Sequence, residues 1–379
     1  DGVHEWVPDR EIKRILTEQA DDLMAACRAL TQLATRNGSN DNLSAQAFTI
    51  HSLPVQDEES YFTELTALPF PPLLEPGQVL DGYRVIREIH AAKRTQVYLV
   101  VDETNGEQRI MKTPSPQFSD DPLFIDLFLH EEWIGRRLQN PHVMKVIEPE
   151  RPRQCLYYIA EYLEGQTLRQ WMNDNPAPPL SRFREIMTEI AAGLRAFQRL
   201  EMIHQDLKPE NIMLTADGCI KIIDFGSAKV AGLAEIETPI DGDVLLGTER
   251  YTAPEYLRGG KATNRADIFS LGVIAYEILT GELPFGTVLT PRNLDKVHYQ
   301  SALLLNDSLP VWVDGALARA VAINPDSRYE SLSEFLQDLR RPNPDFNVAM
   351  PLMQRDPVAF WRGSTVILLI LLVLSLVTR

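Results

Sequence analysis

The stretch from Ile203 to Asn211, followed by Asp224, contains the residue types that phosphoryl transfer requires. Transfer to a hydroxyl group needs a carboxylate that orients the hydroxyl and accepts its proton, a cation near the moving phosphate, and oxygen ligands for Mg²⁺. The stretch contains all three kinds of group. Mg²⁺ is a hard ion that prefers carboxylate and amide oxygens, which suits Asp224 and Asn211. The pattern therefore indicates metal-assisted phosphoryl transfer.

Further motifs occur in the order found in eukaryotic-type serine/threonine protein kinases, which the chain resembles from about Gly77 to Arg341. One such motif alone is weak evidence, whereas the ordered set indicates the fold. The motifs are Arg109-Ile110-Met111-Lys112, Ala160-Glu161-Tyr162-Leu163, His204-Gln205-Asp206, Asp224-Phe225-Gly226, Ala253-Pro254-Glu255 and Asp267-Ile268-Phe269-Ser270-Leu271-Gly272. The resemblance implies an enzyme that transfers the γ-phosphoryl group of ATP to hydroxyl groups of proteins.

The resemblance also assigns roles around the reacting phosphate. Asp206 matches the catalytic aspartate, and Lys208 matches the lysine that touches the transferred phosphate. Asn211 and Asp224 match the ligands of Mg²⁺. Lys208 at this position points to serine or threonine substrates rather than tyrosine.

Other residues match the part of the family's site that binds ATP. Lys112 matches the lysine that grips the α- and β-phosphates, and Glu131 matches its ion-pair partner. Arg328 is expected to pair with Glu255, and we expect this pair and Asp267 to be structural. The expected adenine site combines backbone groups of two hinge residues with three apolar side chains, which are Glu161 and Leu163 with Ile89, Val97 and Met213.

The phosphate-covering loop departs from the family at three positions where glycine is expected. His90, Ala92 and Thr95 occupy them. Glycine lets the backbone approach phosphates closely, so we expect weak ATP affinity. Lys93 or Arg94 can offset part of the loss as a cation beside the phosphates.

Two single positions also depart from the family. Ile110 replaces the usual alanine and is expected to narrow the adenine slot. Gln205 replaces the arginine that normally receives a phosphorylated activation loop, which argues against that mode of control.

The elements that must position these residues follow from apolar periodicity. Alternation and β-branching predict strands at 83–89, 96–101 and 108–112, with a turn at Asn105-Gly106. Helical spacing predicts helices at 124–138, 183–200, 268–279 and 332–339. The prediction is an α+β bilobal kinase fold, with a small β-rich lobe at 77–163 and a large helical lobe at 164–341.

Composition excludes several classes of function. The formal net charge of −16 disfavours binding to nucleic acid or to anionic lipid headgroups. The three cysteines, Cys27, Cys155 and Cys219, are far apart and in no CxxC spacing. Their spacing indicates neither a disulfide framework nor a zinc site and fits a reducing cytosol.

Residues 1–53 suggest a second domain. Helical spacing over 8–34 predicts one amphipathic helix, and 43–53 is predicted as a strand. Asp1-Gly2-Val3 and Gly38-Ser39-Asn40-Asp41-Asn42 resemble the last two motifs of metal-dependent serine/threonine phosphatases, in which Asp1 and Asp41 would hold a bimetal centre. A two-metal hydrolase also needs ligands from earlier strands, so we expect a partial α/β phosphatase tail. The acidic, proline-rich residues 54–76 are predicted to be a linker.

Residues 363–378 carry no charge and consist mostly of Val, Ile and Leu. As a helix of about 1.5 Å per residue they would extend roughly 24 Å, near the ~30 Å of a hydrocarbon core. Phe360, Trp361 and Arg362 suit the membrane interface. We expect a single-pass C-terminal transmembrane helix behind a juxtamembrane segment at 342–362. The kinase domain is expected on the cytoplasmic side because arginines are concentrated before the span. A buried terminal helix is the alternative.

The resemblance leaves two alternative functions open. The degenerate phosphate loop also fits a pseudokinase scaffold with weakened ATP binding. The phosphatase-like residues fit a fusion whose main activity is dephosphorylation by an N-terminal half outside this chain. Neither the protein substrate nor the activating signal follows from the residues.

Overall fold

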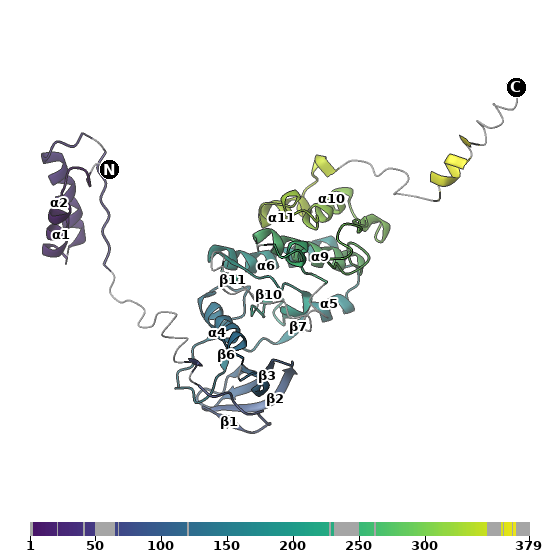
Figure 1. Ribbon diagram of the computed structural model, residues 1–379, viewed down its shortest axis with the longest axis horizontal. Coiled ribbons are helices and arrows are strands. Elements are labelled where there is room, and N and C mark those ends of the chain that lie inside the picture. The colour runs from purple at the N-terminus through teal and green to yellow at the C-terminus, as the bar shows by residue number, and fades with distance from the viewer. Residues whose placement is uncertain are drawn as a thin grey trace. The chain divides into compact units, whose positions relative to one another are not determined.

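The computed structural model describes residues 3–20, 22–40, 42–49, 65–66, 68–119, 121–226, 229–230, 250–260, 263–346, 358, 360–365 and 367–368. The chain divides into two compact units, Asp1–Thr63 and Glu64–Arg379, which are described separately (Figure 1).

The N-terminal unit contains two helices where the sequence pattern predicts one. Helix α1 covers Asp9–Glu18 and helix α2 covers Leu23–Arg36. The chain breaks between them because Asp22 caps α2, its side chain accepting the backbone N–H of Ala25 at 2.9 Å. Val7, Ile15, Ala26, Leu30 and Ala34 form a small core.

The predicted strand at 43–53 is wrong for the part that can be checked. Residues 42–49 form no strand, and 50–53 lie outside the described residues. Alternation alone does not make a strand, because a strand also needs a neighbour that accepts its ladder hydrogen bonds.

The small lobe of the second unit is a six-stranded antiparallel sheet of order β1-β2-β3-β4-β6-β5. Tyr83, Val85, Tyr98, Met111 and Tyr157 belong to its hydrophobic core. The three predicted strands in this region are confirmed. The strands are β1 Val79–Leu80, β2 Tyr83–Ala91, β3 Thr95–Asp102, β4 Gln108–Pro114, β5 Val146–Ile147 and β6 Tyr158–Glu161.

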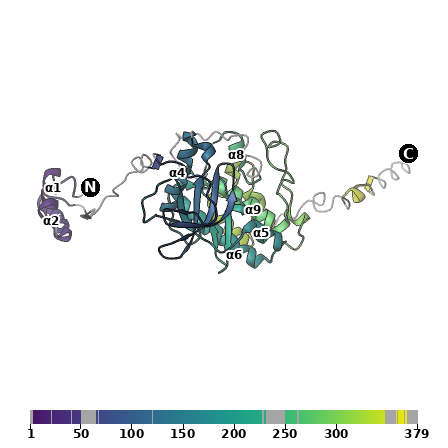
Figure 2. The same cartoon turned by 90° about the horizontal axis from the view of Figure 1, so that it is seen from below.

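Helix α4, Pro122–Arg137, lies beside these strands in both views (Figure 1 and Figure 2). Asp121 begins it by accepting the backbone N–H of Phe124 at 3.2 Å. The sequence prediction of a helix at 124–138 is therefore confirmed, and α4 is the element that carries Glu131.

Part of the segment predicted as a linker packs on the small lobe. The backbone N–H of Leu156 donates to the carbonyl of Pro69 at 2.9 Å. The backbone N–H of Leu74 donates to the hydroxyl of Tyr98 at 3.2 Å. Residues 69–74 thus belong physically with the sheet.

The large lobe is built around α9, Asn264–Thr280, whose residues from Ala266 to Leu279 are all buried. A helix that is apolar on every side must lie in a core. The helices predicted at 183–200, 268–279 and 332–339 are confirmed. Besides α9, the described helices of the large lobe are α5 Leu168–Asp174, α6 Leu180–Arg199, α8 Pro254–Leu257, α10 Val311–Ala320 and α11 Leu332–Arg340. Short 3₁₀ turns occur at Pro116–Phe118, Pro209–Asn211, Ala302–Leu304, Pro325–Ser327 and Pro344–Phe346.

Two small sheets in the large lobe carry the catalytic segments. One has the order β10-β9-β7, and the other pairs β11 with β8. The strands are β7 Gly165–Thr167, β8 Met202–Ile203, β9 Ile212–Thr215, β10 Ile220–Ile222 and β11 Lys229–Val230.

Backbone contacts join the loop after α4 to β10. The N–H of Met144 donates to the carbonyl of Ile222 at 2.8 Å, and the N–H of Ile222 donates to the carbonyl of His142 at 3.0 Å. The loop behind α4 is therefore held on the strand that leads to Asp224.

Within the part of the chain that the structure describes, no helix has both the length and the apolar character needed to cross a membrane. Most of the predicted span at 363–378 lies outside that part, which includes only 363–365 and 367–368 of it.

Candidate active site

A buried ion pair joins β4 to α4. Lys112 Nζ lies 2.6 Å from Glu131 Oε1 and 2.9 Å from Oε2, and Glu131 is only 4% exposed. Asp224 Oδ1 lies 3.9 Å from the same Nζ. Burial alone would lower the pKa of Lys112, but the two carboxylates outweigh it and raise the pKa. Lys112 therefore remains a cation that can bind phosphate.

Tyr158 is a third member of this cluster, and sequence reasoning missed it. Its hydroxyl donates to Glu131 Oε1 at 2.8 Å, and its backbone lies directly opposite Lys112 in the β4–β6 register. Burial, and then the charge of Glu131, raise the pKa of Tyr158 well above its usual value, so the hydroxyl stays a donor. Only the pairing of the two strands reveals this contact.

The catalytic loop holds three of the predicted residues together. Lys208 Nζ donates to Asp206 Oδ2 at 2.8 Å, and Asn211 Nδ2 donates to the same oxygen at 3.1 Å and to the Asp206 carbonyl at 3.0 Å. Burial raises the pKa of Asp206, and the charge of Lys208 opposes the rise. A carboxylate with a raised pKa is a better proton acceptor.

The hairpin of β9 and β10 brings the two predicted metal ligands side by side. Ile212 pairs with Ile222, and the N–H of Ile223 donates to the Asn211 carbonyl at 3.0 Å. Asp224 is the residue after Ile223, so its backbone lies near that of Asn211.

Asp224 lies at the edge of the site with 42% of its side chain exposed. Burial by itself would raise the pKa of Asp224. The charge of Lys112 and the backbone N–H of Gly226, which donates to Oδ1 at 3.2 Å, lower it to about 2. The group is thus an anion at neutral pH.

Phe225 and Gly135 set the position of Asp224. Phe225 is 1% exposed and packs on Phe197, with ring centroids 6.2 Å apart. A Cβ added to Gly135 of α4 would lie 2.7 Å from Phe225 Cε2 and 2.2 Å from Val146 Cγ2. The absence of a side chain at Gly135 therefore lets α4 approach Phe225 closely.

The side chain of Asp267 supports the catalytic loop by accepting hydrogen bonds from the loop's backbone. Its two carboxylate oxygens accept the N–H groups of His204 at 3.0 Å and Gln205 at 3.1 Å. Gln205 has a φ of 65°, a left-handed conformation that costs energy for a residue with a side chain. The buried carboxylate offsets this strain and holds the residue before Asp206 in place.

The expected adenine contacts come from both lobes. Val97 of β3 and Met213 of β9 are partly buried. Ile89 is the extra residue of a β-bulge, because Glu88 pairs with Tyr98 and His90 pairs with Val97, and it is 41% exposed. A bulge turns a side chain away from the regular strand face.

The hinge begins with Glu161, the last residue of β6, and continues beyond the strand. The N–H of Glu161 donates to the Lys145 carbonyl at 2.9 Å, and its side chain accepts from Lys221 Nζ at 2.6 Å. Any backbone contact of Glu161 with adenine must therefore use its carbonyl. Leu163 lies two residues further and is partly buried.

Ile110, which was expected to narrow the adenine slot, lies directly opposite Ala160 in the β4–β6 register. Residues opposite each other on adjacent strands have neighbouring side chains. The large side chain of Ile110 thus lies beside the small side chain of Ala160.

The hairpin between β2 and β3 closes without glycine. The N–H of Ala92 donates to the Thr95 carbonyl at 2.8 Å, and none of residues 90–95 has a positive φ. The Arg94 carbonyl accepts the N–H of Ser115 at 2.7 Å, and its guanidinium lies 5.6 Å from the ring centroid of Phe118. Arg94 is thus engaged at the side of the lobe through its backbone and its guanidinium.

The predicted structural ion pair in the large lobe is confirmed. Arg328 donates to both oxygens of Glu255, at 2.9 and 2.8 Å.

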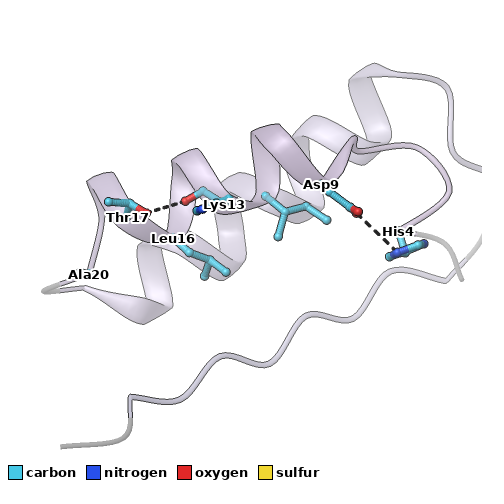
Figure 3. A pocket seen from close by; sticks show the side chains of 7 residues that line it. His4, Asp9, Lys13, Leu16, Thr17 and Ala20 are labelled. Carbon is cyan, nitrogen blue, oxygen red and sulfur yellow. Dashed lines mark hydrogen bonds and ion pairs between the residues drawn. The ribbon is translucent and has the colours of Figure 1, made fainter.

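A pocket on the N-terminal unit lies along α1 (Figure 3). His4 Nε2 lies 3.6 Å from Asp9 Oδ1 there, and the Thr17 hydroxyl donates to the Lys13 carbonyl at 2.8 Å. The predicted phosphatase ligands Asp1 and Asp41 lie outside the described residues.

Comparison with known proteins agrees with this geometry. The family model of the protein kinase domain matches residues 83–345. The serine/threonine-protein kinase PknL of Mycobacterium tuberculosis is 30% identical over 288 residues, covering 73% of this chain and 71% of PknL. The probable serine/threonine-protein kinase PknB of Lactococcus lactis is 28% identical over 273 residues, covering 70% of this chain but only 43% of PknB.

A solved structure is also similar. The crystal structure of the PknI kinase domain of Mycobacterium tuberculosis is 27% identical, with a TM-score of 0.53, and the match covers 70% of this chain and 98% of that one. The bilobal fold predicted from the sequence is therefore confirmed. This chain belongs to the protein kinase family, and residues 83–345 form a protein kinase domain of the bacterial serine/threonine type.

Proposed function

We propose that this chain transfers the γ-phosphoryl group of ATP to serine or threonine hydroxyls of other proteins. The observation that carries the proposal is the assembled Lys112–Glu131 pair with Asp224 only 3.9 Å away. In kinases both the lysine–glutamate pair and the metal-binding aspartate must be in place for transfer.

The residues divide the reaction among them. Lys112 binds the α- and β-phosphates, and Lys208 offsets charge on the phosphoryl group that moves. Asp206 orients the substrate hydroxyl and accepts its proton as the oxygen–phosphorus bond forms and the bond to the β-phosphate oxygen breaks. ADP leaves with the electron pair of the broken bond.

The residues present fit a Mg²⁺ ion. Asp224 is ionised at neutral pH, since its pKa is about 2. Asn211 uses Nδ2 toward Asp206, so its amide oxygen is the atom that it can offer to a metal. One carboxylate and one amide oxygen, with phosphate oxygens, are the hard donors that Mg²⁺ prefers. When bound, the metal held by Asp224 and Asn211 would neutralise negative charge on the phosphates.

The test is phosphate transfer by the purified chain to itself or to a generic protein substrate, with and without Mg²⁺. Asp224→Asn should lower the rate by orders of magnitude. Asp217→Asn is the matched control, because Asp217 lies on the turn of the same hairpin, is exposed and bonds only Thr215 and the local backbone. Equal rates for Asp224→Asn and the parent would contradict the proposal.

The phosphate loop favours a second candidate, a scaffold with little transfer activity. The hairpin tip presents side chains at 90–95 where glycines would admit phosphate. We expect turnover with weak ATP affinity, because catalysis here is mainly positioning and charge stabilisation. Titration of Mg²⁺ and ATP against intrinsic fluorescence separates the two: no binding together with no transfer would support the scaffold.

Membrane attachment is a further proposal that rests on the uncharged run at 363–378. We propose a single-pass anchor with the kinase domain on the cytoplasmic side. Truncation after Arg355 should release the protein from membranes while it still folds. A truncated protein that stays in the membrane fraction without aggregating would contradict the anchor.

Residues 1–53 are proposed to be the tail of a metal-dependent phosphatase. The proposal is supported by the motif resemblance and by the separate helical core of this unit. We expect no Mn²⁺-dependent hydrolysis of a phosphopeptide by this chain. Turnover that disappears in Asp41→Ala would show that the unit is catalytic.

A further inference from the structure

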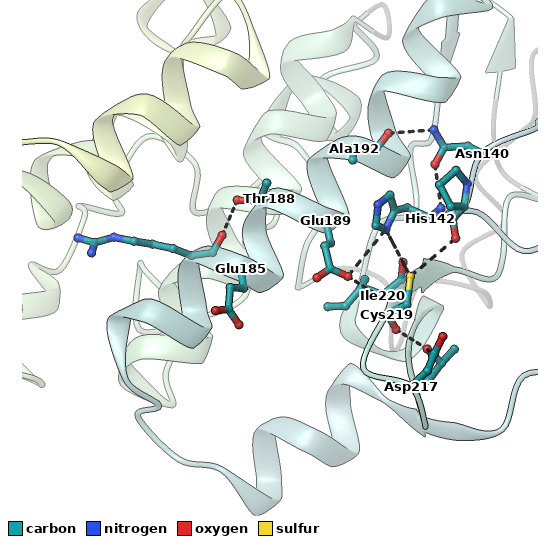
Figure 4. Close-up of polar contacts among 12 residues, drawn as sticks. Asn140, His142, Glu185, Thr188, Glu189, Ala192, Asp217, Cys219 and Ile220 are labelled. Carbon is teal, nitrogen blue, oxygen red and sulfur yellow. Dashed lines mark hydrogen bonds and ion pairs between the residues drawn. The ribbon is translucent and has the colours of Figure 1, made fainter.

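Three potential metal ligands, none of which the proposed transfer reaction uses, meet in the large lobe (Figure 4). His142 lies on the loop after α4, Glu189 on α6, and Cys219 at the turn between β9 and β10. One ligand atom from each lies within 4.8 Å of the others. Figure 4 shows the imidazole, the carboxylate and the sulfur turned toward one another.

The spacing of these atoms resembles the donor spacing around a small cation. Cys219 Sγ lies 3.7 Å and Glu189 Oε2 lies 3.8 Å from His142 Nδ1. The Ile220 carbonyl oxygen adds a fourth donor, 3.0 Å from Nδ1 and 3.7 Å from Sγ. A tetrahedral zinc ion with its usual bond lengths places donors about 3.4–3.6 Å apart.

Hydrogen bonds and close packing hold His142 and Glu189 in the absence of a metal. The backbone N–H of His142 donates to Asn140 Oδ1 at 2.8 Å. The backbone carbonyl of His142 lies so close to α6 that a Cβ on Gly193 would be 2.7 Å from its oxygen. Glu189 Oε2 accepts the N–H of Ile220 at 2.7 Å. His142 and Glu189 are therefore held in place without a metal.

The cluster is also accessible. The side chains of His142 and Glu189 are 21% and 27% exposed, and Cys219 is partly buried. An ion can reach the site from solvent, and a partly desolvated site strengthens its hold on the ion.

We propose that His142, Glu189, Cys219 and the Ile220 carbonyl bind a zinc ion. The mixed sulfur, nitrogen and oxygen donor set is one that zinc accepts. On binding, the Cys219 thiol loses its proton to solvent, and the imidazole carries its remaining proton on Nε2 so that the Nδ1 lone pair faces the metal. The ion would fasten the loop behind α4 to α6 and to the β9–β10 turn.

The competing explanation is a purely hydrogen-bonded contact. His142 Nδ1 can donate to the Ile220 carbonyl, and Glu189 already accepts from the same residue's N–H. That arrangement needs no ion and predicts no uptake of metal, so metal binding distinguishes the two.

The test uses the full chain, purified without a histidine tag and stripped with EDTA. Co²⁺ is the spectroscopic probe, because a bound thiolate gives a charge-transfer band and a tetrahedral site gives intense visible bands. We expect one Co²⁺ per chain, displaced by one Zn²⁺, and a higher melting temperature with Zn²⁺. Kinase activity is not needed for the readout, so the result is independent of the proposed function.

The variants are Cys219→Ser and Glu189→Gln, with Cys155→Ser as the matched control at a second partly buried thiol. We expect Cys219→Ser to lose the charge-transfer band and more than roughly 100-fold in zinc affinity, since outer-shell partners alone contribute ~10–100-fold. Cys155→Ser should behave like the parent. Folded parent protein that takes up no Co²⁺, or uptake that is unchanged in both Cys219→Ser and Glu189→Gln, would overturn the proposal.

Discussion

Removal of Arg328 should destabilise the large lobe more than any exposed charge does. The Arg328 side chain is fully buried, and that of Glu255 is 10% exposed. Besides its two bonds to Glu255, the guanidinium donates to the carbonyls of Ala322 at 2.7 Å and Arg265 at 3.0 Å. It also lies 4.8 Å from the ring centroid of Phe269. Arg328→Met keeps much of the volume and removes every one of these bonds.

The magnitude follows from what the substitution leaves behind. Glu255 becomes a buried carboxylate without its cation, and breaking a buried pair in this way costs about 3–5 kcal/mol. A domain has only about 5–15 kcal/mol of total stability. At about 2–4 °C per kcal/mol for a large domain, the melting temperature should fall by roughly 6–20 °C.

The assay is thermal unfolding followed by circular dichroism, with two comparisons. Arg258→Met removes an exposed pair, in which Arg258 lies 2.6 Å from Asp295 with side-chain exposures of 53% and 87%. Such pairs contribute about 0–1 kcal/mol, so that variant should melt within about 4 °C of the parent. The double variant Arg328→Met/Glu255→Gln should regain part of the loss, because it no longer buries an unpaired charge.

Two results would refute this reasoning. One is an Arg328→Met protein that melts as close to the parent as Arg258→Met does. The other is a double variant with no recovery, which would mean that the carbonyl contacts rather than the ion pair carry the stability.

Three further predictions concern the small lobe and the helix that it shares with the active site. Tyr158→Phe removes the hydroxyl that donates to Glu131 and should lower kcat/KM for phosphate transfer several-fold. The melting temperature, measured on the same variant, should stay unchanged. Gly135→Ala should destabilise the fold by about 1–3 kcal/mol and reduce kcat, because the added methyl group forces α4 away from Phe225; unaltered melting and kcat would show that the contact relaxes. Burial by itself would raise the pKa of Asp102, but the backbone N–H of Thr104 and the side chain of Arg151 outweigh it and lower the pKa in the folded state. Its contribution to stability is therefore present above the unfolded value of about 3.9 and is lost as the pH falls through the folded pKa, so denaturation of Asp102→Asn and the parent should converge in acid.

The sequence predicted the kinase elements well because local patterns determine them. Strands with alternating burial and helices with one apolar face carry their own signal, and helical spacing predicted the core of α9 at 268–279. The pairing of Lys112 with Glu131 and of Glu255 with Arg328 was inferred from motif order, and the structure places both pairs in contact.

The N-terminal unit shows where local patterns fail. A continuous helical period over 8–34 predicted one helix, but Asp22 begins a second helix within it. The apolar spacing survived the break because both helices bury the same small core. The alternation at 43–49 had no neighbouring strand to pair with in the described part of this unit, so it gave no strand.

The amino-acid sequence alone establishes which chemical groups are present and the order in which the chain presents them. Asp206, Lys208 and Asn211 lie within six residues, so one local turn brings them together. Tertiary packing alone decided the partners that come from distant segments. Tyr158 reaches Glu131 only because β6 pairs with β4. His142, Glu189 and Cys219 meet only because the loop behind α4 docks on β10 through backbone hydrogen bonds and lies close to α6 at Gly193. Spacing along the chain carries no record of such a contact, which explains why cysteine spacing showed no zinc site.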